Sequence, residues 1–298
     1  MKLTLRKHSK IEDILIYILA ALVILNHSVY YYMDSSKEVL QYALSIYPIF
    51  LLVILMHARG WKIDRRVGRV FLYTLFFGVL ILCFNTSSGV AVISRYIVYV
   101  PCISIALSEY EKNCKYKFFF AYSNLMIVVA MVSLFFWVFA SVMGLIQSSN
   151  IVPTSWGMSL GGYDKAGRSY GGVYFEMQYI LGSLKEIFHY RNCAIFCEGP
   201  AYAFMLSLAL LTEWVLREKV KLWKVALLSI TLLSTCSAMG VLYIVLIFML
   251  HWLITGRVST KKMLIPIILV FFCAVVSIVI QNKANTTSVS IRLNDYLY

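Results

Sequence analysis

Residues 222–254 read LWKVALLSITLLSTCSAMGVLYIVLIFMLHWLI, an apolar run longer than one membrane crossing needs. The segments on both sides of this run are basic, and basic segments stay on the cytoplasmic side of a membrane. Two short helices of about 15 residues, each about 22 Å long, would return the chain to the cytoplasm. The small and hydroxyl residues at 234–240, which end in a glycine, suit a tight turn. We predict a helical hairpin over 222–254 whose tip reaches the outer surface; the alternative is one long tilted helix.

The composition of the whole chain also indicates a membrane protein. Of its 298 residues, 61% are hydrophobic and 14% are charged, whereas about a quarter of the residues in soluble domains are charged. The net charge of +13 comes from Lys and Arg residues that gather in short loops. That pattern sets the orientation of a membrane protein, so we expect no nucleic-acid partner. The apolar run after the basic N-terminus is too long for a cleaved signal peptide and is expected to remain as the first helix.

Apolar runs predict about nine transmembrane spans in a single integral membrane domain over residues 1–298. Besides the hairpin, spans are expected at 12–32, 40–57, 70–86, 88–108, 118–147, 199–216 and 263–281. The basic loops place the N-terminus in the cytoplasm, and with the hairpin the C-terminal tail lies outside. The predicted fold class is therefore all-α, a polytopic helical membrane protein with one long periplasmic or extracellular loop at 148–198.

The long outer loop has two parts. Residues 155–172 are rich in glycine and serine and are expected to be mobile. In the second part, apolar residues from Phe175 to Phe188 recur at near-helical spacing, opposite polar residues that include Glu176 and Gln178. This spacing predicts an amphipathic helix that lies in the membrane interface or packs on the helix bundle.

Arginines in predicted outer segments are the first candidates for chemistry: Arg168, Arg191 and Arg292. A guanidinium is permanently charged and its planar fork of donors suits phosphate. Gathered at an outer membrane surface, such groups predict a site for a lipid-linked pyrophosphate, whose leaving-group charge they would stabilise. Taken singly, each could equally contact a lipid headgroup, and without the hairpin Arg292 would be cytoplasmic. Arg95 lies about 9 Å deep in an apolar span, where a charge either snorkels or is functional.

Two titratable groups compete for the role of general base. Glu198 directly precedes the span at 199–216. A carboxylate at this position is either simply stabilised by the helix dipole or accepts a proton from a sugar hydroxyl. His189 is the rival, because its unperturbed pKa suits neutral pH. Ser234 and Ser237 at the hairpin tip, together with Tyr202, are expected to line the cavity of the site.

No motif for a cofactor or metal is present in the sequence. It contains no Walker motif, no glycine-rich dinucleotide fingerprint and no HExxH zinc motif. Cys193 and Cys197 lie close together, but no further Cys or His stands at ligand spacing, so buried free thiols are favoured over a disulfide or a metal. An enzyme built from these residues would use a pre-activated donor and no soluble cofactor.

Three segments resemble a known family. Residues 191–200, RNCAIFCEGP, resemble the R-x-x-G-I-F-x-E-P-G signature that opens a membrane helix in O-antigen and capsule polysaccharide polymerases. Residues 234–240 are similar to that family's S-x-S-x-x-G segment, and residues 286–292 to its later outer segment with an arginine. The resemblance covers roughly residue 120 onward. Ala194 replaces the usual glycine, Glu-Gly-Pro replaces Glu-Pro-Gly, and the end at Tyr298 leads us to expect a C-terminally truncated member.

The resemblance implies a glycosyltransferase of the inner membrane that uses no nucleotide sugar. It would polymerise oligosaccharide repeat units of O-antigen, capsule or exopolysaccharide that are carried on undecaprenyl pyrophosphate, at the outer face of the membrane. Arg191 and Arg292 would contact the pyrophosphate, and Glu198 would lie in the active cavity. The implied partners are the lipid-linked glycan, the bilayer, a chain-length regulator and a flippase.

Three alternative functions remain open at the level of sequence. An O-antigen ligase would share this architecture and transfer the glycan to a different acceptor. A membrane acyltransferase is suggested by His27 in the first apolar run, although the arginine expected before that helix is absent. A transporter of lipid-linked sugars could also use a cationic cavity, but the two halves of the sequence contain no paired repeat.

Overall fold

A computed structural model describes residues 10–33, 116–153, 166–178 and 189–255, together with scattered positions between 39 and 79. In these ranges the chain is mostly helical, with one small sheet. It divides into two units. The first comprises Met1–Val128, Ser148–Phe175 and Ile195–Cys197, and the second comprises Val129–Gln147, Glu176–Ala194 and Glu198–Tyr298. Each unit is described below by itself.

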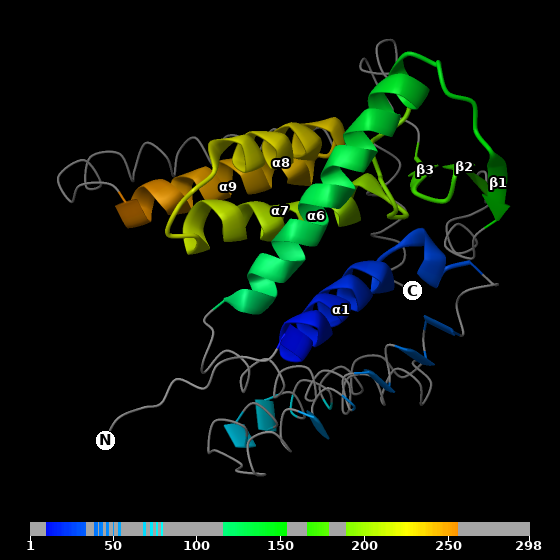
Figure 1. Cartoon of the computed structure of the whole chain (residues 1–298). Coiled ribbons are helices and arrows are strands. Elements are labelled where there is room, and N and C mark those ends of the chain that lie inside the picture. Colours follow the sequence, from blue (N-terminus) through cyan, green and yellow to red (C-terminus); the bar gives the residue numbers. More distant parts are fainter. Residues whose placement is uncertain are drawn as a thin grey trace, which may run out of the picture. The chain divides into compact units, whose positions relative to one another are not determined.

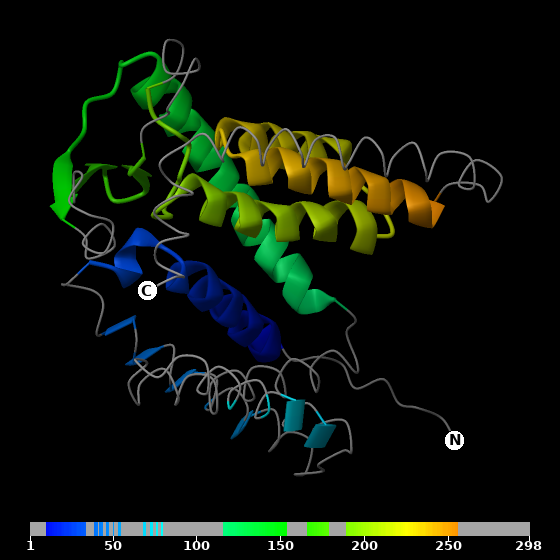
Figure 2. The same ribbon diagram turned by 180° about the vertical axis from the view of Figure 1, so that it is seen from behind.

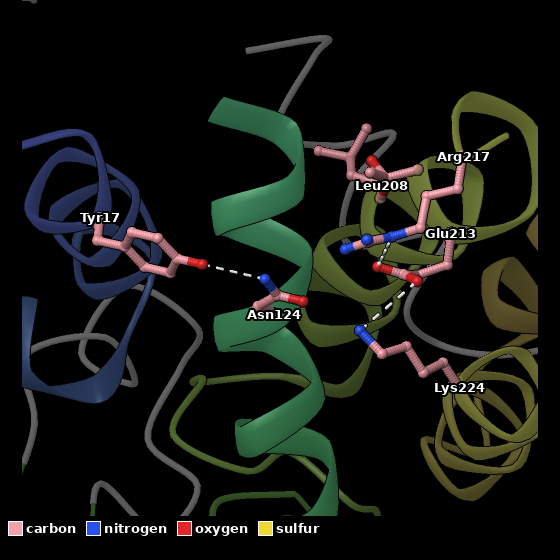
Figure 3. A network of polar contacts seen from close by, with 7 residues as sticks. Tyr17, Asn124, Leu208, Glu213, Arg217 and Lys224 are labelled. Atoms are coloured by element: carbon pink, nitrogen blue, oxygen red, sulfur yellow. Dashed lines mark hydrogen bonds and ion pairs between the residues drawn. The ribbon is translucent and has the colours of Figure 1, made fainter. Parts of the chain in front are cut away.

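In the first unit, α1 (Lys10–Asn26) lies against the beginning of α6 (Lys117–Phe136). The buried side chains of α1 recur every three or four residues, which places them on one helix face: Ile16, Leu19, Ala20 and Ile24. Polar side chains also link the two helices. Lys117 Nζ lies 2.9 Å from Asp13 Oδ1, and Asn124 Nδ2 donates to the Tyr17 hydroxyl at 3.0 Å (Figure 3).

The first span predicted at 12–32 is wrong in its end point, because α1 stops at Asn26. The chain then forms a bridge between Ser28 and Phe196, and the Val29 N–H donates to the Ile195 carbonyl at 2.7 Å. A short 3₁₀ turn, Val29–Tyr31, follows. Pairing with a distant segment therefore ends the helix, although the sequence stays apolar for several more residues.

The segment predicted to be the long outer loop contains a three-stranded sheet, which the all-α prediction did not include. Its strands are β1 (Asn150–Pro153), β2 (Ala166–Tyr170) and β3 (Tyr174–Glu176), in that order. β1 and β2 are antiparallel, and Ile151 pairs with Arg168. Gly171 and Gly172 connect β2 to β3 with φ of +58° and +75°, a conformation that glycine adopts readily.

β2 and β3 each correct one prediction about residues 148–198. Residues 166–170, inside the segment expected to be mobile, form a strand. Phe175 and Glu176, expected to begin an amphipathic helix, are also in a strand, because β3 joins the sheet and Phe175 packs edge-on against Tyr30 with ring centroids 5.6 Å apart. The remainder of the predicted helix, residues 179–188, lies outside the described residues.

In the second unit, α7 (Gly199–Leu211) lies against both α8 (Leu222–Ser234) and α9 (Ala238–Thr255). Figures 1 and 2 show the three helices side by side from opposite directions. Residues around most of the circumference of α7 are buried, as expected for the central helix of such a group. π-helical segments extend α6 over Trp137–Val142 and α7 over Thr212–Leu216.

A buried ion cluster links the C-terminal end of α7 to α8. Glu213 has no exposed surface, and its Oε1 lies 2.7 Å from Arg217 Nε. Lys224 Nζ approaches the other carboxylate oxygen at 3.8 Å (Figure 3). Arg217 and Lys224 were predicted only as part of a basic loop; two of its cations therefore neutralise a buried carboxylate.

The run at 222–254 consists of two helices, with Thr235, Cys236 and Ser237 between them. The break falls inside the predicted turn at 234–240. Cys236 has φ of +46°, and a Cβ on Gly240 would lie 2.9 Å from the Leu232 carbonyl oxygen, so the connection is tight. Because α9 packs against α8, the chain doubles back at this turn.

Three of the described helices are long and apolar enough to cross a membrane: Lys117–Val142, Gly199–Leu216 and Ala238–Thr255. The first two match the spans predicted at 118–147 and 199–216. The spans predicted at 88–108 and 263–281 lie outside the described residues, and only isolated positions are described in those at 40–57 and 70–86. The number of nine spans therefore stays a prediction.

Candidate functional site

The candidate site is the loop that leads into α7, and its central residue is Asn192. Asn192 is completely buried. Its Nδ2 donates to Ser234 Oγ at 2.9 Å and to Ser133 Oγ at 3.3 Å. The Ser133 hydroxyl is also 2.8 Å from the hydroxyl of buried Tyr202. One amide therefore links the loop to α6 and α8 directly, and to α7 through Ser133.

The backbone of this loop is fixed as well. The Asn192 N–H donates to the Ser234 carbonyl at 3.1 Å, and the Asn192 side-chain oxygen accepts from the Ala194 N–H at 3.2 Å. Ala194 has φ of +50°. A left-handed conformation costs a residue with a Cβ about 1–2 kcal/mol, so position 194 favours glycine. The polysaccharide polymerase signature that residues 191–200 resemble has glycine at this position, and Ala194 is one of the two departures of the chain from that signature.

A close contact brings the beginning of α7 to the α8–α9 connection. A Cβ on Gly199 would lie 2.9 Å from the Thr235 carbonyl oxygen and 3.4 Å from Arg191 Cδ. Only a residue without a side chain fits between these atoms. Two of the segments singled out in the sequence, 191–200 and 234–240, therefore touch each other.

Arg191 lies in this contact and is half-buried. Its N–H donates to the Gln178 carbonyl at 3.0 Å, which fixes the main chain. Its Nε is buried and has no hydrogen-bond partner among the residues that the structure describes. Burial raises the pKa of the Cys236 thiol in the α8–α9 connection, and the positive charge of Arg191 opposes that rise. The guanidinium thus acts electrostatically on the tip of the hairpin.

Glu198 occupies the residue before α7, but its side chain makes no capping hydrogen bond. The cap is supplied from elsewhere, because the Gly199 N–H donates to Gln178 Oε1 at 3.0 Å. Glu198 is half-buried. The first N–H of α7 is therefore bound by the neutral side chain of Gln178 and not by the carboxylate of Glu198.

The other predicted site residues are distributed as follows. Ser234 and Tyr202 belong to the buried hydrogen-bond network, and Ser237 is buried in the α8–α9 connection. His189 is exposed in the second unit. Arg168 is exposed on β2, in the first unit. Arg95 and Arg292 lie outside the described residues.

Three residues of this arrangement were not singled out from the sequence: Gln178, Asn192 and Ser133. Asn192 could have been suspected, because it follows Arg191 within the signature. Ser133 lies in an apolar helix and Gln178 in a loop, and no local pattern marks either as a partner of residues about 20 to 70 positions away.

Cys193 and Cys197 are both buried and form no disulfide with each other. Across the described ranges, no three His, Cys, Asp or Glu side chains gather where they could hold a metal ion.

The arrangement combines the half-buried cation of Arg191, the carboxylate of Glu198, which does not cap α7, and the tightly packed contact of Gly199.

We compared the chain with protein-family models, with curated proteins and with solved structures, and none of them matches.

Proposed function

We propose that the chain is a membrane glycosyltransferase that polymerises oligosaccharide repeat units carried on undecaprenyl pyrophosphate. The observation that carries the proposal is the contact of Gly199 with Thr235 and Arg191. This contact joins the two described segments that resemble the polysaccharide polymerases, although they are separated along the chain. Arg191 from one segment therefore lies beside the turn formed by the other, and Glu198 directly precedes the glycine of the contact.

The proposed reaction transfers a glycan from one lipid carrier to another repeat unit. The hydroxyl oxygen of the acceptor sugar attacks the anomeric carbon of the donor glycan, and a new glycosidic bond forms. The bond between that carbon and the pyrophosphate oxygen breaks, and undecaprenyl pyrophosphate leaves with the electron pair. Glu198 accepts the hydroxyl proton. Arg191 stabilises the charge that develops on the leaving pyrophosphate. Arg292, Arg168 and Arg95 are proposed as additional cations that bind the pyrophosphate.

The proposal includes a membrane topology. The chain crosses about nine times, its N-terminus is cytoplasmic, and the long loop and the C-terminal tail lie on the outer side. The break between α8 and α9 supports the hairpin on which this topology depends. With this orientation, the start of α7 and the α8–α9 connection both face the outer side, where the lipid-linked substrate is held.

The test uses the purified chain in lipid nanodiscs with an undecaprenyl-pyrophosphate-linked repeat unit, and product length is read from a gel ladder. The wild-type chain is expected to produce a ladder, and Arg191→Ala is expected to reduce its formation at least about 100-fold. The matched control is Lys219→Ala, which removes an exposed cation beyond α7 and is expected to leave the ladder unchanged.

Other outcomes of the same experiment would contradict the proposal. Transfer of single units to an added lipid acceptor, without a ladder, would indicate the ligase. Ladder lengths that are equal in the wild type and in Arg191→Ala would remove the role of the arginine. Dependence of an acyl-transfer activity on His27, or translocation of the lipid without any glycosidic bond, would indicate the acyltransferase or the transporter.

A further inference from the structure

Gln178 makes two contacts at the candidate site, one through its main chain and one through its side chain. Its carbonyl oxygen accepts from the Arg191 N–H at 3.0 Å, and its side-chain Oε1 accepts from the Gly199 N–H at 3.0 Å. One residue of the outer loop therefore binds the main chain on both sides of Glu198.

The side-chain contact satisfies a group that the helix cannot satisfy itself. The first four N–H groups of a helix have no partner within the helix. A residue directly before a helix accepts from the second or third of these groups, and in α7 the second position is Pro200, which has no N–H. Glu198 makes no capping bond, and the side-chain oxygen of Gln178 binds the first group, the Gly199 N–H.

We infer that Gln178 is a positioning residue that leaves the Glu198 carboxylate available to accept the proton of the acceptor sugar. This inference rests on the proposed glycosyl transfer. A carboxylate that caps its own helix is held against the backbone N–H groups, and these stabilise its charge. Such a group is a weaker and misdirected base. Because the neutral amide of Gln178 binds the start of α7, holding the helix and accepting the proton are tasks of two different residues.

The test is a double-mutant cycle between positions 178 and 198. Gln178→Met keeps the length of the side chain and removes the acceptor, while the main-chain carbonyl that binds Arg191 is retained. In the wild-type background we expect the rate of glycosyl transfer to fall about tenfold, because the main chain next to Glu198 loses the bond that fixes it and the carboxylate is no longer held in position. In a Glu198→Gln background the same change is expected to alter the residual rate less than about twofold.

Two further variants make the test independent of folding. Gln178→Glu restores an acceptor oxygen at the same distance along the side chain and is expected to regain most of the rate. Gln147→Ala removes an exposed glutamine from the same unit and is expected to have no effect. Unfolding midpoints in nanodiscs are measured for every variant, so that rates are compared per folded molecule.

Each result decides the inference. A tenfold loss in both backgrounds would show that Gln178 acts only through the stability of α7 and would overturn the positioning role. A rate unchanged by Gln178→Met, or no recovery with folded Gln178→Glu, would overturn it as well. If the wild-type chain produces no polymer, the proposed function fails first, and the inference falls with it. If the wild type is active and Gln178→Met is normal, the inference alone fails.

Discussion

At its C-terminal end, α7 is held to α8 by charge: Glu213 is buried between Arg217 and Lys224. At its N-terminal end, the same helix is held by neutral groups, namely the amides of Gln178 and Asn192 and the glycine contact with Thr235. The charged residues there, Arg191 and Glu198, form no ion pair with another residue that the structure describes.

We infer from this difference that the charges at the C-terminal end of α7 stabilise the fold, whereas those at its N-terminal end serve the proposed reaction. A buried carboxylate with two cations is neutralised within the protein, and its removal is expected to affect folding. A cation and a carboxylate that neutral neighbours hold in place remain able to respond to a substrate. The following predictions test this separation at each end of α7, from the largest effect to the smallest.

Glu198→Gln is expected to lower the rate of glycosyl transfer by about 100-fold or more, because the general base is lost. The unfolding midpoint should stay unchanged, since the side chain makes no capping bond with α7. Rates and midpoints are measured in nanodiscs. The matched control is Glu218→Gln, an exposed carboxylate just beyond α7, which should change neither quantity. A large fall in the midpoint of Glu198→Gln would assign this carboxylate to the fold.

Arg217→Met is expected to show the opposite behaviour. It removes the closer of the two cations at buried Glu213, which should lower the free energy of unfolding by about 3 kcal/mol. Glycosyl transfer per folded molecule should stay unchanged. Thermal unfolding and single-turnover rates are compared with those of Lys219→Met, which removes an exposed cation nearby. Loss of transfer at wild-type stability would give the C-terminal end of α7 a functional role.

Gly199→Ala tests whether the two motif segments must touch. The added Cβ would lie 2.9 Å from a main-chain oxygen of Thr235, so we expect a loss of about 1–3 kcal/mol in the free energy of unfolding. Because the same Cβ also presses on Arg191 Cδ, transfer by the folded fraction should fall as well. Wild-type values for both quantities would mean that the segments can separate without consequence.

Ala194→Gly has the smallest expected effect and is favourable. It relieves a left-handed conformation with φ of +50°, and this gain is partly offset by the greater freedom of glycine in the unfolded chain. We expect a net gain of about 0.5 kcal/mol in the free energy of unfolding. Ala209→Gly, inside α7, should instead lose about 1 kcal/mol. A destabilised Ala194→Gly would show that the loop prefers a Cβ at this position.

Much of the helical structure could be predicted because its signals are local. Long apolar runs without internal proline or glycine gave the positions of α6 and α7, and the cluster of small and hydroxyl residues fell at the break between α8 and α9. The end of α1 and the sheet could not be predicted in this way. Both depend on pairing with distant segments, as the bridge between Ser28 and Phe196 illustrates.

The sequence by itself determined that the chain is rich in apolar helices, where several of them lie, and which charged residues stand at the start of α7. Hydrophobicity and helical periodicity are properties of neighbouring residues, so they can be read from one segment at a time. The tertiary structure alone decided that Asn192 is buried, that Gln178 binds the first N–H of α7, and that Lys224 approaches buried Glu213. These roles depend on hydrogen bonds and ion pairs with partners on other elements, which cannot be read from one segment of the chain.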